Sequence, residues 1–183
     1  MKQTTTTDMP SRELRNALGL YTTGVAVVTC AGPGGHRCGV TVNSFASVSL
    51  DPPLVLWSLQ RSSPSLETFE QAGHFAVNVL AQDQQDVSDR FARPAIDKFD
   101  GLVCSGGLNG VPLLPACLAR FECRTEACHE GGDHVIFVGR VLRWTATPGA
   151  PLVFHGGRYD RLVGHRAALD RSAKATACAA CAA

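Results

Sequence analysis

The sequence predicts a mainly β fold, a closed or nearly closed antiparallel barrel with short helices at its ends. Apolar runs of strand composition, rich in Val, Leu and Phe, recur along the chain. Turn residues such as Gly32-Pro33-Gly34-Gly35 separate several of these runs. Most runs follow one another directly and do not alternate with long helices, which favours antiparallel hairpins over βαβ units.

The strands are expected at 25–30, 38–42, 54–59, 74–80, 118–125, 135–144 and 151–154. The first run is rich in β-branched residues. The glycines after it should connect it to the second run as a hairpin. Residues 92–116 carry much Gly and Pro and are expected to form a long surface loop.

Helices are expected at 11–20, 63–71 and 82–91. Ser11 and Ser63 are candidate N-caps of the first two. Pro64 suits the first helical position, and Gly73 should end the second helix. All three helices are short, so they should cover the ends of the barrel.

One connection is longer than a hairpin needs. Between strand-like runs at 39–42 and 54–57, residues 43–49 read Asn-Ser-Phe-Ala-Ser-Val-Ser, whereas a hairpin turn takes about two to five residues. Small polar side chains let a ligand approach the backbone closely and offer hydroxyl and N–H donors. We therefore expect this connection to form a ligand-binding lip.

Size and charge restrict the function classes. The chain has 183 residues, 45% of them hydrophobic, which favours one domain with a full core. A net charge of +1 without a Lys/Arg run argues against nucleic-acid binding. No apolar run reaches about 18 residues, so no membrane-spanning helix is expected. The N-terminus lacks the apolar core of a signal peptide, which favours the cytoplasm.

Composition also divides the chain into three parts. Residues 1–10 are expected to be a disordered N-terminus and 11–166 a single domain. Residues 167–183 form an alanine-rich, low-complexity tail.

The eight cysteines are expected to be reduced in a cytoplasmic protein. Cys30, Cys117 and Cys123 lie in apolar runs and should pack in the core. Cys178 and Cys181 have metal-binding spacing but lack a second pair nearby. A zinc site elsewhere would have to be assembled from Cys123, Cys128, His129 and His134. No metal is expected.

Several catalytic signatures are absent. There is no Gly-x-Gly-x-x-Gly turn between a strand and a helix, no Walker A loop and no Gly-x-Ser-x-Gly elbow. Two polar clusters remain. The segment 60–65 could bind a phosphate through exposed N–H groups and Ser hydroxyls, or simply cap a helix. Asp133 and His134 follow two glycines at a strand entrance and could face a ligand, or form an ordinary surface turn.

Taken in order from residue 15 to residue 159, the motifs resemble the flavin reductase-like, FMN-binding split-barrel family. They include Gly39-Val40-Thr41-Val42-Asn43-Ser44-Phe45, Phe75-Ala76-Val77-Asn78-Val79-Leu80, Gly132-Asp133-His134 and Gly157-Arg158-Tyr159. The resemblance implies an antiparallel split β-barrel that forms a homodimer, with flavin near the subunit interface.

The resemblance also implies site residues. The segment 41–49 would wrap the isoalloxazine largely through its backbone, and His134 would be the catalytic residue, positioning the nicotinamide. The implied cofactor-binding residues are Thr41, Val42, Asn43, Ser44, Ser47, Val48, Ser49, Ser62 and Ser63 (at the phosphate), Lys98 and Phe99 (at the adenylate), His134 and Tyr159.

The implied activity is that of an NAD(P)H:flavin oxidoreductase. It would transfer hydride from NADH, or from NADPH, to FAD or FMN and supply reduced flavin to a partner monooxygenase. Hydride transfer between two cofactors needs no protein nucleophile, which agrees with the missing catalytic signatures. Two alternatives remain: a flavoprotein that retains its flavin for a different redox reaction, and a non-catalytic flavin-binding redox module.

Overall fold

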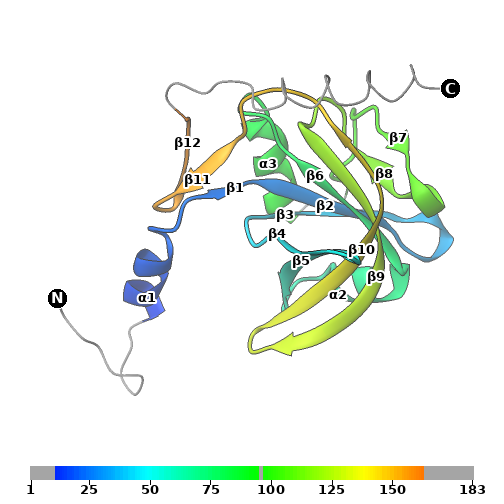
Figure 1. The fold of residues 1–183 in the computed structure, drawn as a ribbon, viewed down its shortest axis with the longest axis horizontal. Coiled ribbons are helices and arrows are strands. Elements are labelled where there is room, and N and C mark those ends of the chain that lie inside the picture. The colour runs from blue at the N-terminus through cyan, green and yellow to red at the C-terminus, as the bar shows by residue number, and fades with distance from the viewer. Residues whose placement is uncertain (1–10, 95–96, 163–183) are drawn as a thin grey trace, which may run out of the picture.

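The structure is a computed structural model and describes residues 11–94 and 97–162. A seven-stranded antiparallel sheet curves into a barrel, in the order β3-β2-β6-β9-β10-β5-β4 (Figure 1). Its end strands β3 and β4, both fully described, do not pair with each other, so the barrel is split. The strands are β2 (Ala26–Ala31), β3 (Arg37–Val42), β4 (Ala46–Leu50), β5 (Pro53–Gln60), β6 (His74–Val79), β9 (Ala119–Gly131) and β10 (His134–Ala146).

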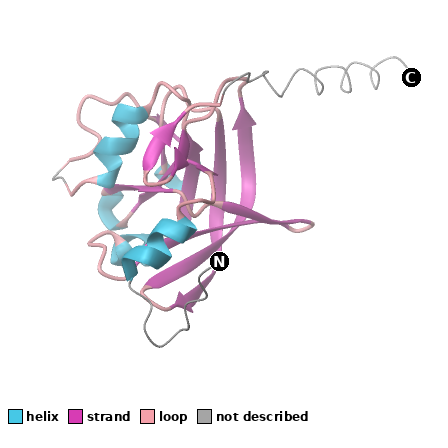
Figure 2. Ribbon diagram, turned by 90° about the vertical axis from the view of Figure 1, so that its left-hand side faces the viewer, coloured by secondary structure: helices cyan, strands magenta, loops and turns pink. Residues whose placement is uncertain are grey.

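Smaller elements surround this sheet. A three-stranded sheet joins β1 (Thr23–Gly24), β11 (Val153–His155) and β12 (Arg158–Asp160). A hairpin joins β7 (Ser105–Gly106) and β8 (Pro112–Leu113). The α-helices, drawn cyan in Figure 2, are α1 (Ser11–Leu18), α2 (Leu66–Ala72) and α3 (Gln85–Ala92). Helix α2 contacts β2 and β6, and α3 contacts β2 and β3. Within the described residues, none of the helices has the length and apolar character needed to cross a membrane.

The barrel core is built around one tryptophan. Trp57 on β5 is fully buried and stacks on Phe137 of β10, with ring centroids 4.6 Å apart. Phe69 of α2 meets the indole edge-on at 4.9 Å, so α2 closes this part of the barrel. A second cluster includes Phe91 of α3 and Phe99, whose rings are 5.0 Å apart. It holds α3 and the following loop against the sheet.

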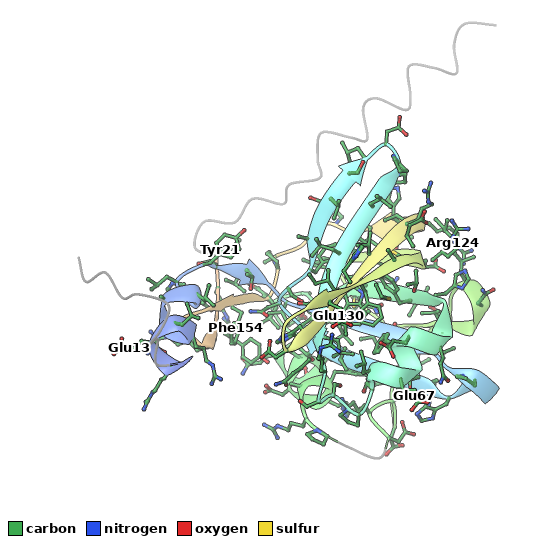
Figure 3. The ribbon with its side chains drawn as sticks, turned by 90° about the horizontal axis from the view of Figure 1, so that it is seen from below. Glu13, Tyr21, Glu67, Arg124, Glu130 and Phe154 are labelled. Atoms are coloured by element: carbon green, nitrogen blue, oxygen red, sulfur yellow. The ribbon has the colours of Figure 1, made fainter. Side chains whose placement is uncertain are left out.

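The helix α1 forms an arm that lies apart from the barrel (Figure 1). Its link to β11–β12 includes a hydrogen bond from the Gly156 amide to the Gly19 carbonyl, 2.8 Å long. Leu18, Leu20 and Tyr21 are 67%, 72% and 80% exposed. Figure 3 shows Tyr21, which follows α1, near Phe154 of β11. The arm therefore presents apolar side chains that nothing in the described chain covers.

The predicted barrel and hairpins are confirmed, whereas several boundaries and details of the prediction were wrong. Residues 46–50, expected within an irregular lip, form edge strand β4, because their backbone pairs with β5. The second helix begins at Leu66 and not at Ser63, because Ser63 accepts a hydrogen bond from the Ser65 amide and closes a turn before the helix. The expected loop 92–116 contains the β7–β8 hairpin.

The long hairpin β9–β10 extends past the predicted strand ends, because its ladder continues to the Gly131–His134 pair. The expectations for residues 1–10 and for the tail 167–183, with Cys178 and Cys181, lie outside the described residues. Cys30, Cys117 and Cys123 are buried as predicted.

Candidate functional site

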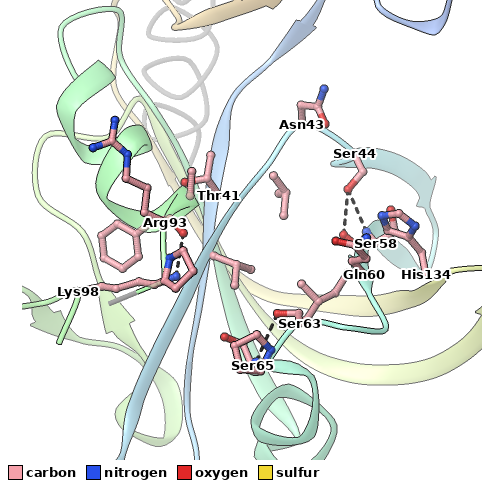
Figure 4. Close-up of a pocket in the computed structure, with 17 residues that line it drawn as sticks. Thr41, Asn43, Ser44, Ser58, Gln60, Ser63, Ser65, Arg93, Lys98 and His134 are labelled. Carbon is pink, nitrogen blue, oxygen red and sulfur yellow. Dashed lines mark hydrogen bonds between the residues drawn. The ribbon is translucent and has the colours of Figure 1, made fainter. Parts of the chain in front are cut away.

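A cavity of about 310 Å³ opens between the end of β3, the end of β5 and the segment after α3 (Figure 4). Small hydroxyl and amide side chains line it, together with two cations, and none of the described lining residues carries a carboxylate. The lining residues are Val40, Thr41, Val42, Asn43, Ser44, Ser58, Leu59, Gln60, Ser63, Pro64, Ser65, Phe91, Ala92, Arg93, Pro94, Lys98 and His134.

Ser44 fixes the connection after β3 to the neighbouring strand. Its Oγ accepts a hydrogen bond from the Ser58 amide at 3.0 Å and donates to the Ser58 carbonyl at 3.3 Å. Both bonds cross the cavity wall (Figure 4). These bonds, together with Phe45, whose ring centroid lies 5.7 Å from that of Phe121, hold the connection in place beside the cavity.

The turn between β5 and α2 forms a second wall and is tied to the tip of the β9–β10 hairpin. The Arg61 amide donates to the Asp133 carbonyl and its Nε to the Gly132 carbonyl, both at 2.9 Å, and its guanidinium pairs with Glu130. Arg61 is therefore engaged by the hairpin and does not line the cavity. Ser63 lines it, whereas Ser62 is exposed outside it.

His134 enters the cavity from the first position of β10, opposite Gln60. Its Nδ1 lies 2.7 Å from Oδ1 of Asp133. This hydrogen bond is the main cause that lowers the pKa of the Asp133 carboxyl. The carboxylate therefore holds the imidazole in one orientation at the rim, with 41% of the side chain exposed.

Lys98 forms the opposite wall. Its Nζ donates to the Phe91 carbonyl at 2.9 Å and to the Gly39 carbonyl at 3.2 Å. Burial lowers the pKa of this lysine, and the charge of Cys38 partly opposes that shift. Lys98 also lines an adjoining cavity of about 210 Å³, together with Phe99. Phe99 is itself buried, and the guanidinium of Arg37 lies 4.9 Å from its ring centroid.

Tyr159 reaches the same connection from another side. It lines a smaller cavity of about 190 Å³ with Thr41, Val42 and Asn43. Its hydroxyl lies 2.8 Å from Ser88 Oγ and donates to Asp89 Oδ1 at 3.1 Å. Burial is the main cause that raises the pKa of Tyr159, and its hydroxyl proton is engaged by Asp89.

The structure therefore brings most predicted site residues to one region. The cavity of about 310 Å³ is lined by seven of them, namely Thr41, Val42, Asn43, Ser44, Ser63, Lys98 and His134. Phe99 and Tyr159 line adjoining cavities. Ser47, Val48 and Ser49 lie on β4 and Ser62 on the outer turn, outside the three cavities described above.

Sequence reasoning missed Ser58 and Arg93 as lining residues, and it considered Gln60 and Ser65 only within the possible phosphate site at 60–65. The strand alternation of β5 carried a usable signal for two of them. Val55, Trp57 and Leu59 are buried on one face, which leaves Ser58 and Gln60 on the other. Arg93 had no such signal, because its position depends on how the loop after α3 packs.

The cavity fits a flavin nucleotide in size and chemistry. Sites for small molecules commonly measure about 300–1,000 Å³ and combine an apolar lining with a few placed polar groups. Lys98 and Arg93, with no carboxylate on the wall, suit a ligand with a phosphate. Among the described residues, no three His, Cys, Asp or Glu side chains gather as a metal site, and the zinc ligands considered from the sequence do not converge.

The split barrel and its polar, cation-lined cavity at the end of β3 are consistent with a small protein that binds a flavin nucleotide. The flavin reductase-like domain model matches residues 18–163. The chain therefore belongs to the flavin reductase-like family, and this confirms the resemblance seen in the sequence.

Known relatives agree with this assignment. The NADH-dependent FMN reductase SmoA of Agrobacterium fabrum is 54% identical over 151 residues, which cover 82% of this chain and 86% of that protein. The reductase component of the flavin-dependent trigonelline monooxygenase of Acinetobacter baylyi is 45% identical over 148 residues. These cover 81% of this chain but 48% of that protein, so this chain spans about half of that relative.

Solved structures confirm the split barrel. An NADH:FAD oxidoreductase of Streptomyces globisporus, solved with NAD and FAD fragments, superposes with a TM-score of 0.79 at 37% identity. The match covers 84% of this chain and 93% of that one. The styrene monooxygenase flavin reductase of Pseudomonas putida gives a TM-score of 0.75 at 35% identity and covers 84% and 99% of the two chains.

Proposed function

We propose that the protein is an NAD(P)H:flavin oxidoreductase that reduces FAD or FMN with NADH, or with NADPH, and passes the reduced flavin to a flavin-dependent monooxygenase. The observation that carries this proposal is the cavity wall of Thr41, Asn43, Ser44, Lys98 and His134 in a chain of the flavin reductase-like family. Relatives of several kinds are named as reductase components of such monooxygenases.

The residues of the chain position the reactants. When bound, flavin supplies the hydride acceptor and the reduced nicotinamide supplies the donor. The backbone after β3, held by Ser44, supports the ring system. Ser63 and Lys98 lie where a phosphate and the rest of the nucleotide would extend. His134, oriented by Asp133, would orient the nicotinamide at the rim, and close placement of the two rings would contribute to the rate enhancement.

We further propose that two copies form a homodimer through the arm and edge strand β4. Leu18, Leu20 and Tyr21 on the arm, and Val48 and Leu50 on β4, are exposed apolar side chains of the kind that mark protein interfaces. In the dimer, Ser47, Val48 and Ser49 would approach the flavin, as the resemblance implies. The reaction is assigned to the cytoplasm, where thiols stay reduced; the six cysteines that the structure describes are free.

The decisive experiment measures NADH and NADPH oxidation with FAD, FMN and riboflavin in parallel. We expect steady oxidation that depends on added free flavin. A yellow purified protein whose flavin exchanges slowly would instead favour a flavoprotein with a retained prosthetic group. Flavin binding without any nicotinamide oxidation would favour a non-catalytic module.

A further inference from the structure

Cys30 on β2 and Cys38 on β3 lie directly opposite each other in the first hairpin of the barrel. Both side chains pack into the same core cluster, so both point to the same side of the sheet. Opposed residues in antiparallel strands have Cα atoms about 4.5 to 5.5 Å apart. Disulfides form across about 4.4 to 6.8 Å. The two sulfurs can therefore be joined with little backbone movement.

The two thiols differ in access. Cys38 is 8% exposed and borders the cavity of about 210 Å³ that adjoins the candidate flavin site. Cys30 is fully buried. A small reagent that enters this cavity reaches Cys38 before Cys30. Cys30, the opposite cysteine of the hairpin, can then form a disulfide with it.

The surroundings also favour Cys38 as the nucleophile. A hydrogen bond from Cys30 is the main cause that lowers the pKa of Cys38; Ser65, Lys98 and His36 lower it further, against the effect of burial. The same hydrogen bond, with burial, raises the pKa of Cys30. A more acidic, accessible thiol beside a protonated, buried one is the arrangement of an attacking and a resolving cysteine.

We propose that Cys30 and Cys38 form an oxidisable dithiol, which a small hydroperoxide converts into a disulfide within the chain. The Cys38 thiolate attacks the peroxide, so that an S–O bond forms, the O–O bond breaks, and the leaving oxygen departs as water after protonation. Cys30 then attacks the Cys38 sulfur, which forms the S–S bond and expels a second water with the proton of Cys30. Two thiols and one hydrogen peroxide thus give one disulfide and two waters.

This oxidation changes the wall that the two cavities share. Lys98 lines both cavities, and in its thiolate form Cys38 places a negative charge beside it. A disulfide carries no charge. Oxidation therefore removes the local counter-charge of Lys98 and ties the edge strand β3 covalently to β2.

In the test, the reduced full-length protein is treated with hydrogen peroxide in its native state. Free thiols are then alkylated in denaturant, and the tryptic peptides are analysed by mass spectrometry. Cleavage at Arg37 separates the two cysteines, because Cys30 lies in peptide 16–37 and Cys38 in peptide 38–61. We expect these peptides to be recovered linked, lighter by two hydrogen atoms than their sum, and separable by dithiothreitol. On a non-reducing gel, the linked species should migrate as a monomer.

Variants identify the order of steps. In Cys30→Ser we expect Cys38 to accumulate as a sulfenic acid that dimedone traps. Cys117→Ser is the matched control, because Cys117 is 5% exposed and borders another open cavity, but burial raises its pKa to about 11. This variant should form the 30–38 disulfide at the wild-type rate. The proposal is overturned if the wild-type peptides are recovered separately or are linked only between chains. It is also overturned if Cys38 is oxidised to sulfinic acid while Cys30 is recovered as a free, alkylatable thiol.

Discussion

The side-chain amide of Asn78 donates a hydrogen bond to Oγ1 of Thr29 over 3.1 Å, and both residues are fully buried inside the barrel. The same amide donates to the Val27 carbonyl at 3.0 Å, and its oxygen accepts from the Leu114 amide at 3.0 Å. Thr29 in turn donates to the Pro112 carbonyl at 2.6 Å. This network attaches the β8 region to strands β2 and β6.

Asn78→Ala should therefore destabilise the protein by about 3 kcal/mol, because several buried polar groups lose their partners. Equilibrium urea unfolding measures the change. Gln71→Ala, on the exposed face of α2, should change the free energy of unfolding by less than about 0.5 kcal/mol. Equal stability of the two variants would contradict the role of the network.

Gly139 is required by packing between β10 and the core. A Cβ atom at this position would lie 2.3 Å from Cζ of Phe75 and 3.0 Å from Cβ of Cys123. We expect Gly139→Ala to lower the free energy of unfolding by about 2 kcal/mol, the usual effect of overpacking. Gly24→Ala is the control, because a Cβ on that strand glycine meets no atom within 4 Å. Equilibrium urea unfolding measures both variants. Similar midpoints would contradict the prediction, because they would show that Phe75 and Cys123 can move to accommodate the added methyl group.

His134→Ala should lower the rate of NADH oxidation about tenfold, the loss of one positioning contact of about 1.4 kcal/mol, while flavin affinity stays nearly unchanged. Steady-state kinetics and a flavin titration separate the two effects. His129→Ala provides a matched control on the neighbouring strand, because His129 is exposed and outside the cavity. Wild-type turnover of His134→Ala would remove this residue from the nicotinamide site.

Bulk at two serines tests the extent of the flavin site. Ser44→Leu fills the cavity wall and breaks both bonds to Ser58, so flavin affinity should fall by at least about tenfold. We expect Ser47→Leu, on β4, to weaken flavin binding through the proposed dimer. If a fluorescence titration shows that only Ser44→Leu binds flavin poorly, the site is restricted to the cavity of one chain.

Lowering the pH should weaken the ion pairs that Glu126 forms with Arg124 and Arg140 on the β9–β10 hairpin. Two hydrogen bonds from Arg140, with one from Arg124, lower the pKa of Glu126 from 4.5 to about 2. A carboxyl whose pKa is lower in the folded state stabilises the fold above the unfolded-state pKa. That contribution disappears as the pH falls from about 4.5 towards 2.

Wild type and Glu126→Gln should therefore differ in urea midpoint at neutral pH and converge as the solution is acidified. A difference that grows in acid would have the wrong sign and would contradict the assignment.

The sequence by itself determined where most strands lie along the chain, and it determined the family. Strand composition and turn glycines predicted the hairpins, since both depend on residues close together in the chain. The polar connection after residue 42 was predicted as a ligand site for the same reason. The family motifs, which are recognised along the chain, also indicated a flavin reductase.

Only the tertiary structure decided which distant residues meet. Strand pairing opposes Cys30 to Cys38, and the packing of the loop after α3 brings Lys98 to the Gly39 carbonyl. The pairing of residues 46–50 with β5 turned part of the expected lip into an edge strand. Register and loop packing depend on contacts made throughout the fold, and no local pattern in the sequence encodes them.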